Sequence, residues 1–239
     1  MINPNLDLEA LAKSYQVNKS LKIENFMQPE IAERMRDACL SHVPFNVQYV
    51  VDDNYQSKTP QEVASLNPQQ AQHINSKVSS AASQGVGFLY EGYASTRAKT
   101  ETNKSINPEL TFLHTIFDYL GSEEVLNLIT KITSDHKVTG ADSQYTRFTP
   151  GHFLTRHLDV MPGRGRKFAF VLGLTKDWHP DWGGLLQFYE QDGTPLESWM
   201  PQFNVLSIFD VSHIHAVTYV TPYALAPRLS LAGWFVHRD

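Results

Sequence analysis

Cysteine is almost absent from this sequence, since Cys39 is the single cysteine in 239 residues. One thiol cannot form an internal disulfide, and cysteine-rich zinc or iron–sulfur sites are excluded for the same reason. Cys39 lies in a stretch whose apolar residues follow helical spacing. We therefore expect a buried structural thiol rather than a nucleophile.

Long apolar runs are absent as well. No stretch reaches the roughly 18 apolar residues that a membrane-spanning helix needs. The chain begins Met-Ile-Asn-Pro-Asn-Leu-Asp-Leu-Glu, without the basic and apolar regions of a secretory signal. These absences predict a cytoplasmic protein with no membrane partner. The sequence also lacks a phosphate-cradling glycine loop, a Gly-x-Ser-x-Gly elbow and a His-Glu-x-x-His motif.

Basic residues are fewer than acidic ones. The sequence has 20 lysines and arginines and 25 acidic residues, which gives a formal net charge of -5. Proteins that bind nucleic acid through general electrostatics usually carry a basic face, so no direct nucleic-acid binding is expected. Residues 145–167 depart from this balance, with Asp159 as the one acid among five basic residues: Arg147, Arg156, Arg164, Arg166 and Lys167. Two readings are open. They are solvated loop charges, or a cationic rim that meets an anionic cosubstrate or an acidic or RNA-associated partner.

The first half of the chain is predicted to supply helices and outer strands. Apolar spacing and end signals indicate helices over residues 7–15, 31–41, 110–120 and 123–133. Runs of β-branched and aromatic residues indicate strands over residues 21–26, 45–51 and 86–93. Residues 52–84 are rich in Gln, Asn, Ser and Ala, which favours irregular surface structure with one candidate helix over 68–79. The polar residues 94–108 form either a plain connector or a lid over an active site.

The second half changes to short strands broken by turns. The expected strands cover residues 144–148, 153–157, 167–174, 184–190, 204–209, 216–220 and 228–236. Strands of this length and spacing are typical of a jelly-roll, that is, a double-stranded β-helix. The predicted fold class is therefore mainly β with N-terminal helices (α+β). We expect one domain over 1–239, with 1–140 as helical support and outer strands and 141–239 as the catalytic jelly-roll strands.

A metal site is suggested by His157-Leu-Asp159, because residues two apart on a strand leave the same face and can meet at one ion. A third ligand must come from a distant strand. His213 and His215 are both available, and they also differ by two, so face parity does not choose between them. Two imidazoles and one carboxylate on one side of a metal leave its other positions free, which suits non-haem Fe(II) chemistry with oxygen.

Five stretches of residues 145–235 form a family pattern: His157-Leu-Asp159, Trp182-Gly-Gly-Leu-Leu-Gln-Phe-Tyr189, Asn204-Val-Leu-Ser-Ile-Phe209, His215-Ala-Val217 and Arg228-Leu-Ser-Leu-Ala-Gly-Trp-Phe235. They resemble the Fe(II)- and 2-oxoglutarate-dependent dioxygenases of the prolyl-hydroxylase type, and within them the ribosomal-protein prolyl hydroxylase branch. This chain would have a single catalytic domain, without the second, non-catalytic jelly-roll of eukaryotic relatives. The resemblance implies His157, Asp159 and His215 as the iron ligands and leaves His213 as a neighbour. It also implies Fe(II), 2-oxoglutarate and O2 as cofactor and cosubstrates, and it allows ascorbate.

Arg228 and Ser230 share a strand face, and the resemblance gives them the far carboxylate of 2-oxoglutarate. A guanidinium offers a carboxylate two parallel hydrogen bonds. The sequence departs from the family pattern at Phe148, where many relatives have a cosubstrate-binding tyrosine nine residues before the first histidine ligand. Tyr145, on the same strand, is the candidate replacement.

The implied reaction is hydroxylation of an unactivated C–H bond, with a prolyl residue of a protein or peptide as the first candidate substrate and release of succinate and CO2. A free amino acid or other small metabolite is the alternative within this class. A cupin-like metal-binding module without catalysis is the alternative from a different class. Both the choice between C3 and C4 of proline and the oligomeric state stay open.

Overall fold

A computed structural model describes residues 1–52, 54–96 and 107–238 of the chain. Its helices are α1 (Leu8–Asn18), α2 (Pro29–His42), α3 (Pro60–Ala64), α4 (Pro68–Ser83), α6 (Pro108–Leu120) and α7 (Glu123–Thr133), with a short 3-10 turn η1 (Pro180–Trp182). Its strands are β1 (Ser20–Ile23), β2 (Asn46–Val51), β3 (Asn54–Lys58), β4 (Phe88–Ala94), β5 (Gly140–Phe148), β6 (Phe153–His157), β7 (Arg166–Gly173), β8 (Leu186–Tyr189), β9 (Pro195–Trp199), β10 (Leu206–Asp210), β11 (Ile214–Val217) and β12 (Arg228–Val236).

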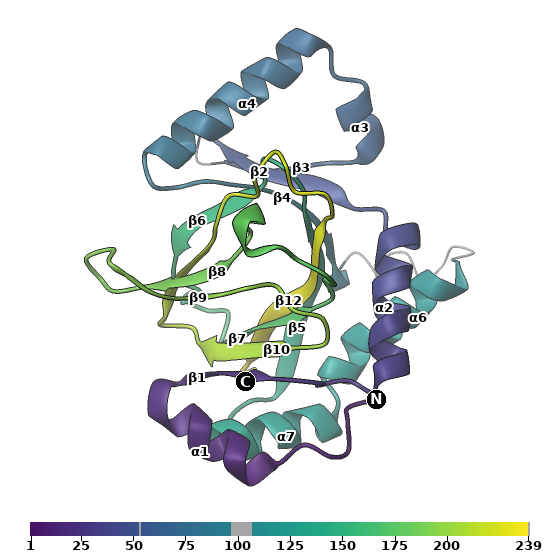
Figure 1. The fold of residues 1–239 in the computed structure, drawn as a ribbon, viewed down its shortest axis with the longest axis vertical. Coiled ribbons are helices and arrows are strands. Elements are labelled where there is room, and N and C mark those ends of the chain that lie inside the picture. The colour runs from purple at the N-terminus through teal and green to yellow at the C-terminus, as the bar shows by residue number, and fades with distance from the viewer. Residues whose placement is uncertain (53, 97–106, 239) are drawn as a thin grey trace.

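The strands form one curved antiparallel sheet in the order β1-β10-β7-β12-β5-β4-β6-β11-β8-β9, and the β2–β3 pair extends from β4. β12 lies at the centre of the longer part and pairs along its length with β5 and β7. The shorter part, β6-β11-β8-β9, turns back to face the longer part (Figure 1). Antiparallel strands send alternate side chains to opposite faces, so one face of each part lines the space between them.

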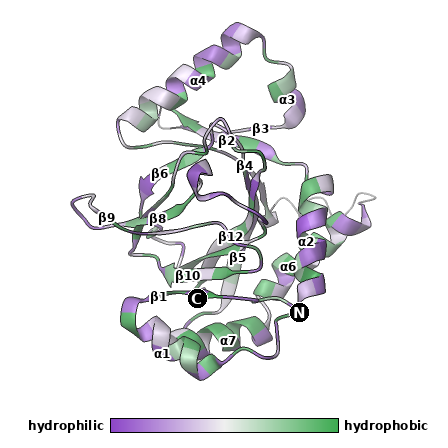
Figure 2. Cartoon of the chain, in the orientation of Figure 1, coloured by the Kyte–Doolittle hydropathy of each residue, from purple (hydrophilic) through white to green (hydrophobic). Residues whose placement is uncertain are grey.

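The main core lies between the outer face of the longer sheet and the helices. α6 sends its apolar side, including Leu113 and Ile116, toward this face, where Tyr145, Leu231 and Phe235 are fully buried. α2 and α7 complete the cover, and α1 packs beside α7. Figure 2 shows hydrophobic residues gathered on the strands, α6 and α7, whereas α4 is largely hydrophilic. Apolar burial of this kind is the main favourable contribution to folding.

The predicted helices over 7–15, 31–41, 110–120 and 123–133 are confirmed, with ends within a few residues of those expected. Gly121 ends α6, and the side chain of Ser122 accepts a hydrogen bond at the start of α7. Cys39 is buried as expected, and burial raises the pKa of its thiol well above the ordinary value. The thiol therefore stays protonated at neutral pH.

The candidate helix over 68–79 is confirmed as α4, but the expectation of irregular structure over the rest of 52–84 was wrong. The segment contains β3, α3 and α4, and both helices begin with a reciprocal cap, Thr59 with Glu62 and Asn67 with Gln70. Such caps satisfy free backbone N–H groups at a helix start, which offsets a weak apolar pattern. β9 was not expected either. Most of the candidate lid over 94–108 lies outside the described residues, and no described helix is long and apolar enough to cross a membrane.

Replacement of Ile116 by alanine tests the helix-to-sheet core. The side chain is completely buried on α6, so the change should lower the free energy of unfolding by about 2–5 kcal/mol, measured by urea denaturation. Val17→Ala is the control, because 76% of Val17 is exposed on α1 and its loss should have little effect. Equal effects of the two changes would contradict this account of the core.

Candidate metal and cosubstrate site

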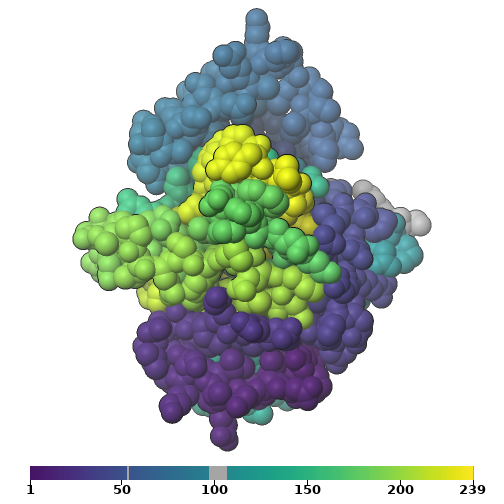
Figure 3. Space-filling model, viewed as in Figure 1, coloured from purple at the N-terminus to yellow at the C-terminus, as the bar shows by residue number. Residues whose placement is uncertain are grey.

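A cavity of about 210 Å³ lies between the two parts of the sheet. The longer part contributes Phe148, Ala169, Arg228 and Ser230, among others, and the shorter part contributes Leu154, His157, Leu186 and His215. On the face shown in Figure 3, residues of the C-terminal half cover the centre of the molecule, between the α3–α4 region above and the N-terminal residues below. The polar groups of the cavity come from distant parts of the sequence.

His157, Asp159 and His215 meet at one side of this cavity. β6 and β11 are paired so that His157 and His215 stand opposite each other, with ring centroids 4.2 Å apart. Asp159 follows β6 and brings its Oδ1 within 3.7 Å of His157 Nε2 and its Oδ2 within 3.4 Å of His215 Nε2. One donor atom from each residue lies within 4.8 Å of the others. Two imidazole nitrogens and a carboxylate in this arrangement fit a divalent transition metal.

The two imidazoles are held in the orientation that a metal requires. Nδ1 of His157 lies 2.9 Å from the carbonyl oxygen of Thr155, and Nδ1 of His215 lies 2.9 Å from that of His213. These carbonyls can only accept, so each Nδ1 carries the proton and each Nε2 keeps its lone pair. Burial, followed by the neighbouring His157, lowers the pKa of His215 to about 4. His215 is therefore neutral, as a ligand must be, across the physiological pH range.

Arg228 lies on β12 beside the same cavity and is only 4% exposed. Its Nε has no hydrogen-bond partner, and within residues 1–52, 54–96 and 107–238 no carboxylate forms an ion pair with it. Its guanidinium carbon lies 5.0 Å from the ring centre of Phe148, the residue paired with Arg228 on β5. Burial lowers the pKa of Arg228 to about 10, so the group remains charged at neutral pH.

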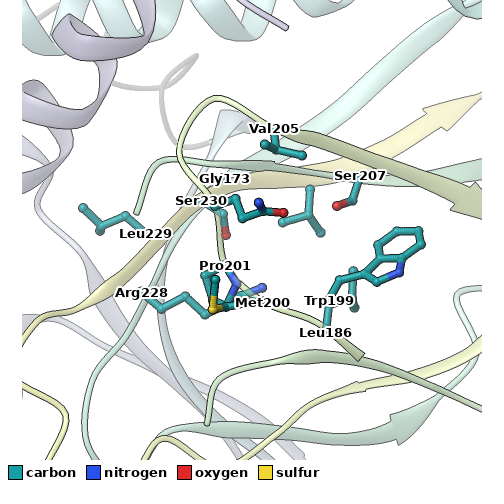
Figure 4. A pocket seen from close by; sticks show the side chains of 12 residues that line it. Gly173, Leu186, Trp199, Met200, Pro201, Val205, Ser207, Arg228, Leu229 and Ser230 are labelled. Carbon is teal, nitrogen blue, oxygen red and sulfur yellow. The ribbon is translucent and has the colours of Figure 1, made fainter. Parts of the chain in front are cut away.

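Figure 4 shows a small chamber that shares Arg228 and Ser230 with the cavity, and in it Arg228 lies beside Met200 and Pro201. Ser230 Oγ is 2.7 Å from Thr146 Oγ1 on β5, so two hydroxyl groups accompany the guanidinium. A buried cation without a counter-ion is costly. These donors therefore fit an anionic ligand such as a carboxylate. The His-Asp-His group in the same cavity fits a metal ion, which could bind the 2-oxo end of a dicarboxylate whose other end is bound by Arg228.

The model of the 2OG-Fe(II) oxygenase superfamily matches residues 143–236, which contain all of these groups. The match covers 94 of the 239 residues, and this segment is similar to members of that superfamily. The chain is also 38% identical over 78 residues to prolyl 3-hydroxylase OGFOD1 of Xenopus laevis and 37% identical over 78 residues to that of Mus musculus. Each alignment covers 30% of this chain, but only 15% and 14% of the length of those relatives.

Two solved structures share the fold over nearly the whole chain. A prolyl 4-hydroxylase of Pseudomonas putida is similar with a TM-score of 0.61 and 17% identity, covering 97% of this chain and 100% of its own. A prolyl hydroxylase of Trichoplax adhaerens, solved with a peptide fragment of hypoxia inducible factor, gives a TM-score of 0.59 and 16% identity, covering 96% of this chain and 89% of its own. The predicted jelly-roll with N-terminal helices is thereby confirmed.

Glycine has a steric role in this site. Gly184 has φ of +63°, and a Cβ there would lie 3.1 Å from the Trp178 ring and 3.2 Å from both Arg228 Cδ and a methyl group of Val220. Trp178, Phe148 and Val220 form an apolar cluster around the stem of Arg228. Gly184 therefore lets the chain pass close to Arg228 without displacing it. The loop 178–182 supplies aromatic packing, with the rings of Trp178 and Trp182 edge to face and their centroids 5.2 Å apart.

The prediction for Tyr145 requires correction. Its side chain points to the helix side of β5, is completely buried, and donates a hydrogen bond of 3.2 Å to the carbonyl oxygen of Leu113 on α6. Phe148 lines the cavity instead. Because positions 145 and 148 differ by three, they face opposite sides of the strand. Tyr145 is a core residue and cannot replace a cosubstrate-binding tyrosine at Phe148.

The basic cluster over 145–167 does not form one rim. Arg147 is paired with Glu91 at 2.6 Å, and Arg156 stacks over Tyr189. Arg166 lies 3.4 Å from the ring centre of Trp234 and 3.9 Å from Asp159 Oδ1, so it contacts two residues of the cavity wall. Sequence reasoning missed this role of Arg166, as it missed Thr146 and Tyr90 in the cavity wall. Thr146 could have been found by parity, because it shares a strand face with Phe148.

Replacement of each candidate histidine by alanine tests the ligand assignment. His215→Ala should lose most bound Fe(II) or Mn(II), because the triad would keep only two ligands. His213→Ala is the matched control. The His213 ring lies 3.1 Å from the carbonyl oxygen of Asp210 and 3.2 Å from that of Asn18, and it does not line the cavity. Metal content after anaerobic gel filtration measures both variants, and equal losses would show that the assignment of His215 is wrong.

Proposed function

We propose that the protein is an Fe(II)- and 2-oxoglutarate-dependent dioxygenase that hydroxylates a C–H bond of a bound substrate. The observation that carries this proposal is the buried Arg228, without a carboxylate partner in the described chain, in the same cavity as His157, Asp159 and His215. A metal-binding module without catalysis has no need of a buried, unpaired guanidinium. The cupin-like alternative leaves this cation unexplained.

In this proposal, His157, Asp159 and His215 hold Fe(II) on one side and leave its other positions open. Arg228 and Ser230 bind the far carboxylate of 2-oxoglutarate through charge-assisted hydrogen bonds. The charges support the pairing. Fe(II) with one ionised aspartate keeps one positive charge, 2-oxoglutarate brings two negative charges, and Arg228 supplies the balance. When bound, the metal and 2-oxoglutarate couple O2 to C–H hydroxylation and release succinate and CO2; ascorbate stays a candidate reductant.

The remaining residues of the cavity exclude water and orient the ligands. Asp159 and His215 are 6% and 5% exposed, and Phe148 of the cavity wall packs in an apolar cluster with Trp178 and Val220. In a site from which water is excluded, each charged contact is stronger than it would be in solution. The opposing guanidinium of Arg166, 3.9 Å from Asp159, holds that carboxylate in place.

The proposed substrate is a prolyl residue in a protein or peptide. Support comes from the prolyl 3-hydroxylase relatives and from the peptide bound to the Trichoplax adhaerens protein. Aromatic rings follow one another from the exposed Tyr55 through Phe88 and Tyr90 to Phe148, and such a wall suits an apolar ring. The ribosomal-protein branch is the proposed group, and a free amino acid or other small metabolite is the second candidate.

Arg228→Ala is the direct test of cosubstrate binding. The affinity for 2-oxoglutarate should fall about 30-fold or more, because removal of one partner from a buried charge pair costs about 2 kcal/mol at least. Anaerobic titration of the Fe(II)-loaded protein, followed by its visible absorption band, measures the affinity. Wild-type protein that gives no band would refute the proposed function. Arg156→Ala is the control, because Arg156 stacks over Tyr189 away from the cavity.

Mass spectrometry of peptides incubated with the loaded protein tests the substrate. A prolyl peptide should gain the mass of one oxygen atom only when Fe(II), 2-oxoglutarate and O2 are all present, and fragmentation assigns C3 or C4. The Asp159→Ala protein serves as the inactive control, because it lacks the carboxylate of the triad. Oxygen addition to a free amino acid but to no peptide would favour the second candidate.

A further inference from the structure

Among the described aromatic residues that line the cavity, Tyr90 on β4 is the one that carries a hydroxyl group on its ring. Its neighbours in the wall, Phe88 and Phe148, are apolar. Gln144 Nε2 donates a hydrogen bond of 3.3 Å to the Tyr90 hydroxyl oxygen. The proton of that hydroxyl has no acceptor among the described residues. Polar hydrogens inside proteins are normally paired, so an unused donor in a cavity wall indicates an acceptor on a bound molecule.

The direction of the Tyr90 side chain is fixed by packing. Its ring stacks on Phe148, with centroids 5.2 Å apart and planes 13° apart, and it packs on Phe88 at 5.5 Å. Phe148 in turn stands opposite Arg228 in the register of β5 and β12. Tyr90, Phe148 and Arg228 therefore form one row across three neighbouring strands. Tyr90 therefore lies two strands from Arg228, the residue that binds 2-oxoglutarate in the proposed function.

The hydroxyl contacts the cavity face of β5, on which the groups beside Arg228 also lie. Gln144, which holds the phenol oxygen, shares the cavity face of β5 with Thr146, and Thr146 contacts Ser230. The rim end of the aromatic series is marked by Tyr55, which is 59% exposed. An acceptor that reaches the Tyr90 hydroxyl therefore belongs to a molecule seated against this face of β5. The cosubstrate meets this condition better than a substrate entering from the rim.

Tyr90 is a donor and not a base at neutral pH. Burial, opposed in part by the hydrogen bond from Gln144, raises the pKa of the phenol to about 12. The neighbouring Asp159 acts in the same direction, because its negative charge disfavours a phenolate. The proton thus stays on the oxygen, where a carboxylate or keto oxygen can accept it.

We propose that the Tyr90 hydroxyl donates a hydrogen bond to an oxygen of 2-oxoglutarate and positions it between the His-Asp-His group and Arg228. This inference rests on the proposed function. It assigns to β4 the hydroxyl that the family resemblance placed on β5, where this chain has Phe148. The stacked pair Tyr90–Phe148 then acts as one unit, in which Phe148 holds the ring and Tyr90 supplies the donor.

Tyr90→Phe tests the proposal because it removes one oxygen atom and keeps the stacked ring. Anaerobic titration of the Fe(II)-loaded protein with 2-oxoglutarate, and calorimetric titration of the Zn(II)-loaded protein, both report binding without turnover. We expect about tenfold weaker binding of 2-oxoglutarate, the effect of losing one hydrogen bond to a charged group. Tyr55→Phe is the matched control, because it removes a hydroxyl from the exposed end of the same aromatic series and should leave the affinity unchanged.

The outcomes separate this inference from the function on which it rests. If metal-loaded wild-type protein does not bind 2-oxoglutarate, the proposed function fails. If the wild type binds and Tyr90→Phe binds equally well, only the role of Tyr90 is overturned. A Tyr90→Phe protein that changes the KM of a substrate but not the affinity for 2-oxoglutarate also overturns it. Gln144→Leu should also weaken 2-oxoglutarate binding, because the Tyr90 hydroxyl loses the hydrogen bond that orients its proton. An unchanged melting temperature of this variant would exclude a folding defect.

Discussion

The buried guanidinium of Arg228 is the constraint on which the rest of the site depends. β12 carries it in the centre of the sheet, and Trp178, Phe148 and Gly184 pack around its stem, so the charge cannot turn toward solvent. Desolvation of a cation without a counter-ion opposes folding. An anionic ligand removes that penalty, and any molecule that binds only the folded state also stabilises it. Ligand binding and fold stability are therefore linked through this side chain.

The two strand pairs place the charges at opposite sides of one cavity. The β6–β11 pair sets His157 opposite His215, and the β5–β12 pair sets Phe148 opposite Arg228. Within each strand, a spacing of two residues adds the second group, Asp159 after His157 and Ser230 after Arg228. A shift of one residue in either pair would turn its polar groups away from the cavity. The apolar core beneath β5 and β12 fixes that register, because Tyr145, Leu231 and Phe235 must stay on the helix side.

Spacing along one strand was predictable from the sequence, and pairing between strands was not. Parity placed Arg228 with Ser230 on one face, and the main helices were found from their apolar periodicity. Parity could not separate His213 from His215, because the turn before β11, where His213 contacts the carbonyl of Asn18, directs His213 away from the cavity. The same rule, applied to Tyr145 and Phe148, would have prevented the assignment of Tyr145. β3, α3 and β9 were missed because capping and pairing with neighbours stabilise them more than their own apolar residues do.

Tyr90 shows why a binding site has to be interpreted by the face of a sheet rather than by position along a strand. Nothing in the sequence Val-Gly-Phe-Leu-Tyr-Glu-Gly-Tyr over residues 86–93 indicates which of its two tyrosines faces the cavity. The pairing of Glu91 with Arg147 decides it, because this register puts Tyr90 beside Phe148 and turns Tyr93 into the helix-side core. Where one strand carries a phenylalanine in place of a tyrosine, a tyrosine on the neighbouring strand can supply the hydroxyl group. A ligand then meets an aromatic ring and a hydroxyl group as before. A phenylalanine at position 148 is therefore compatible with a complete site.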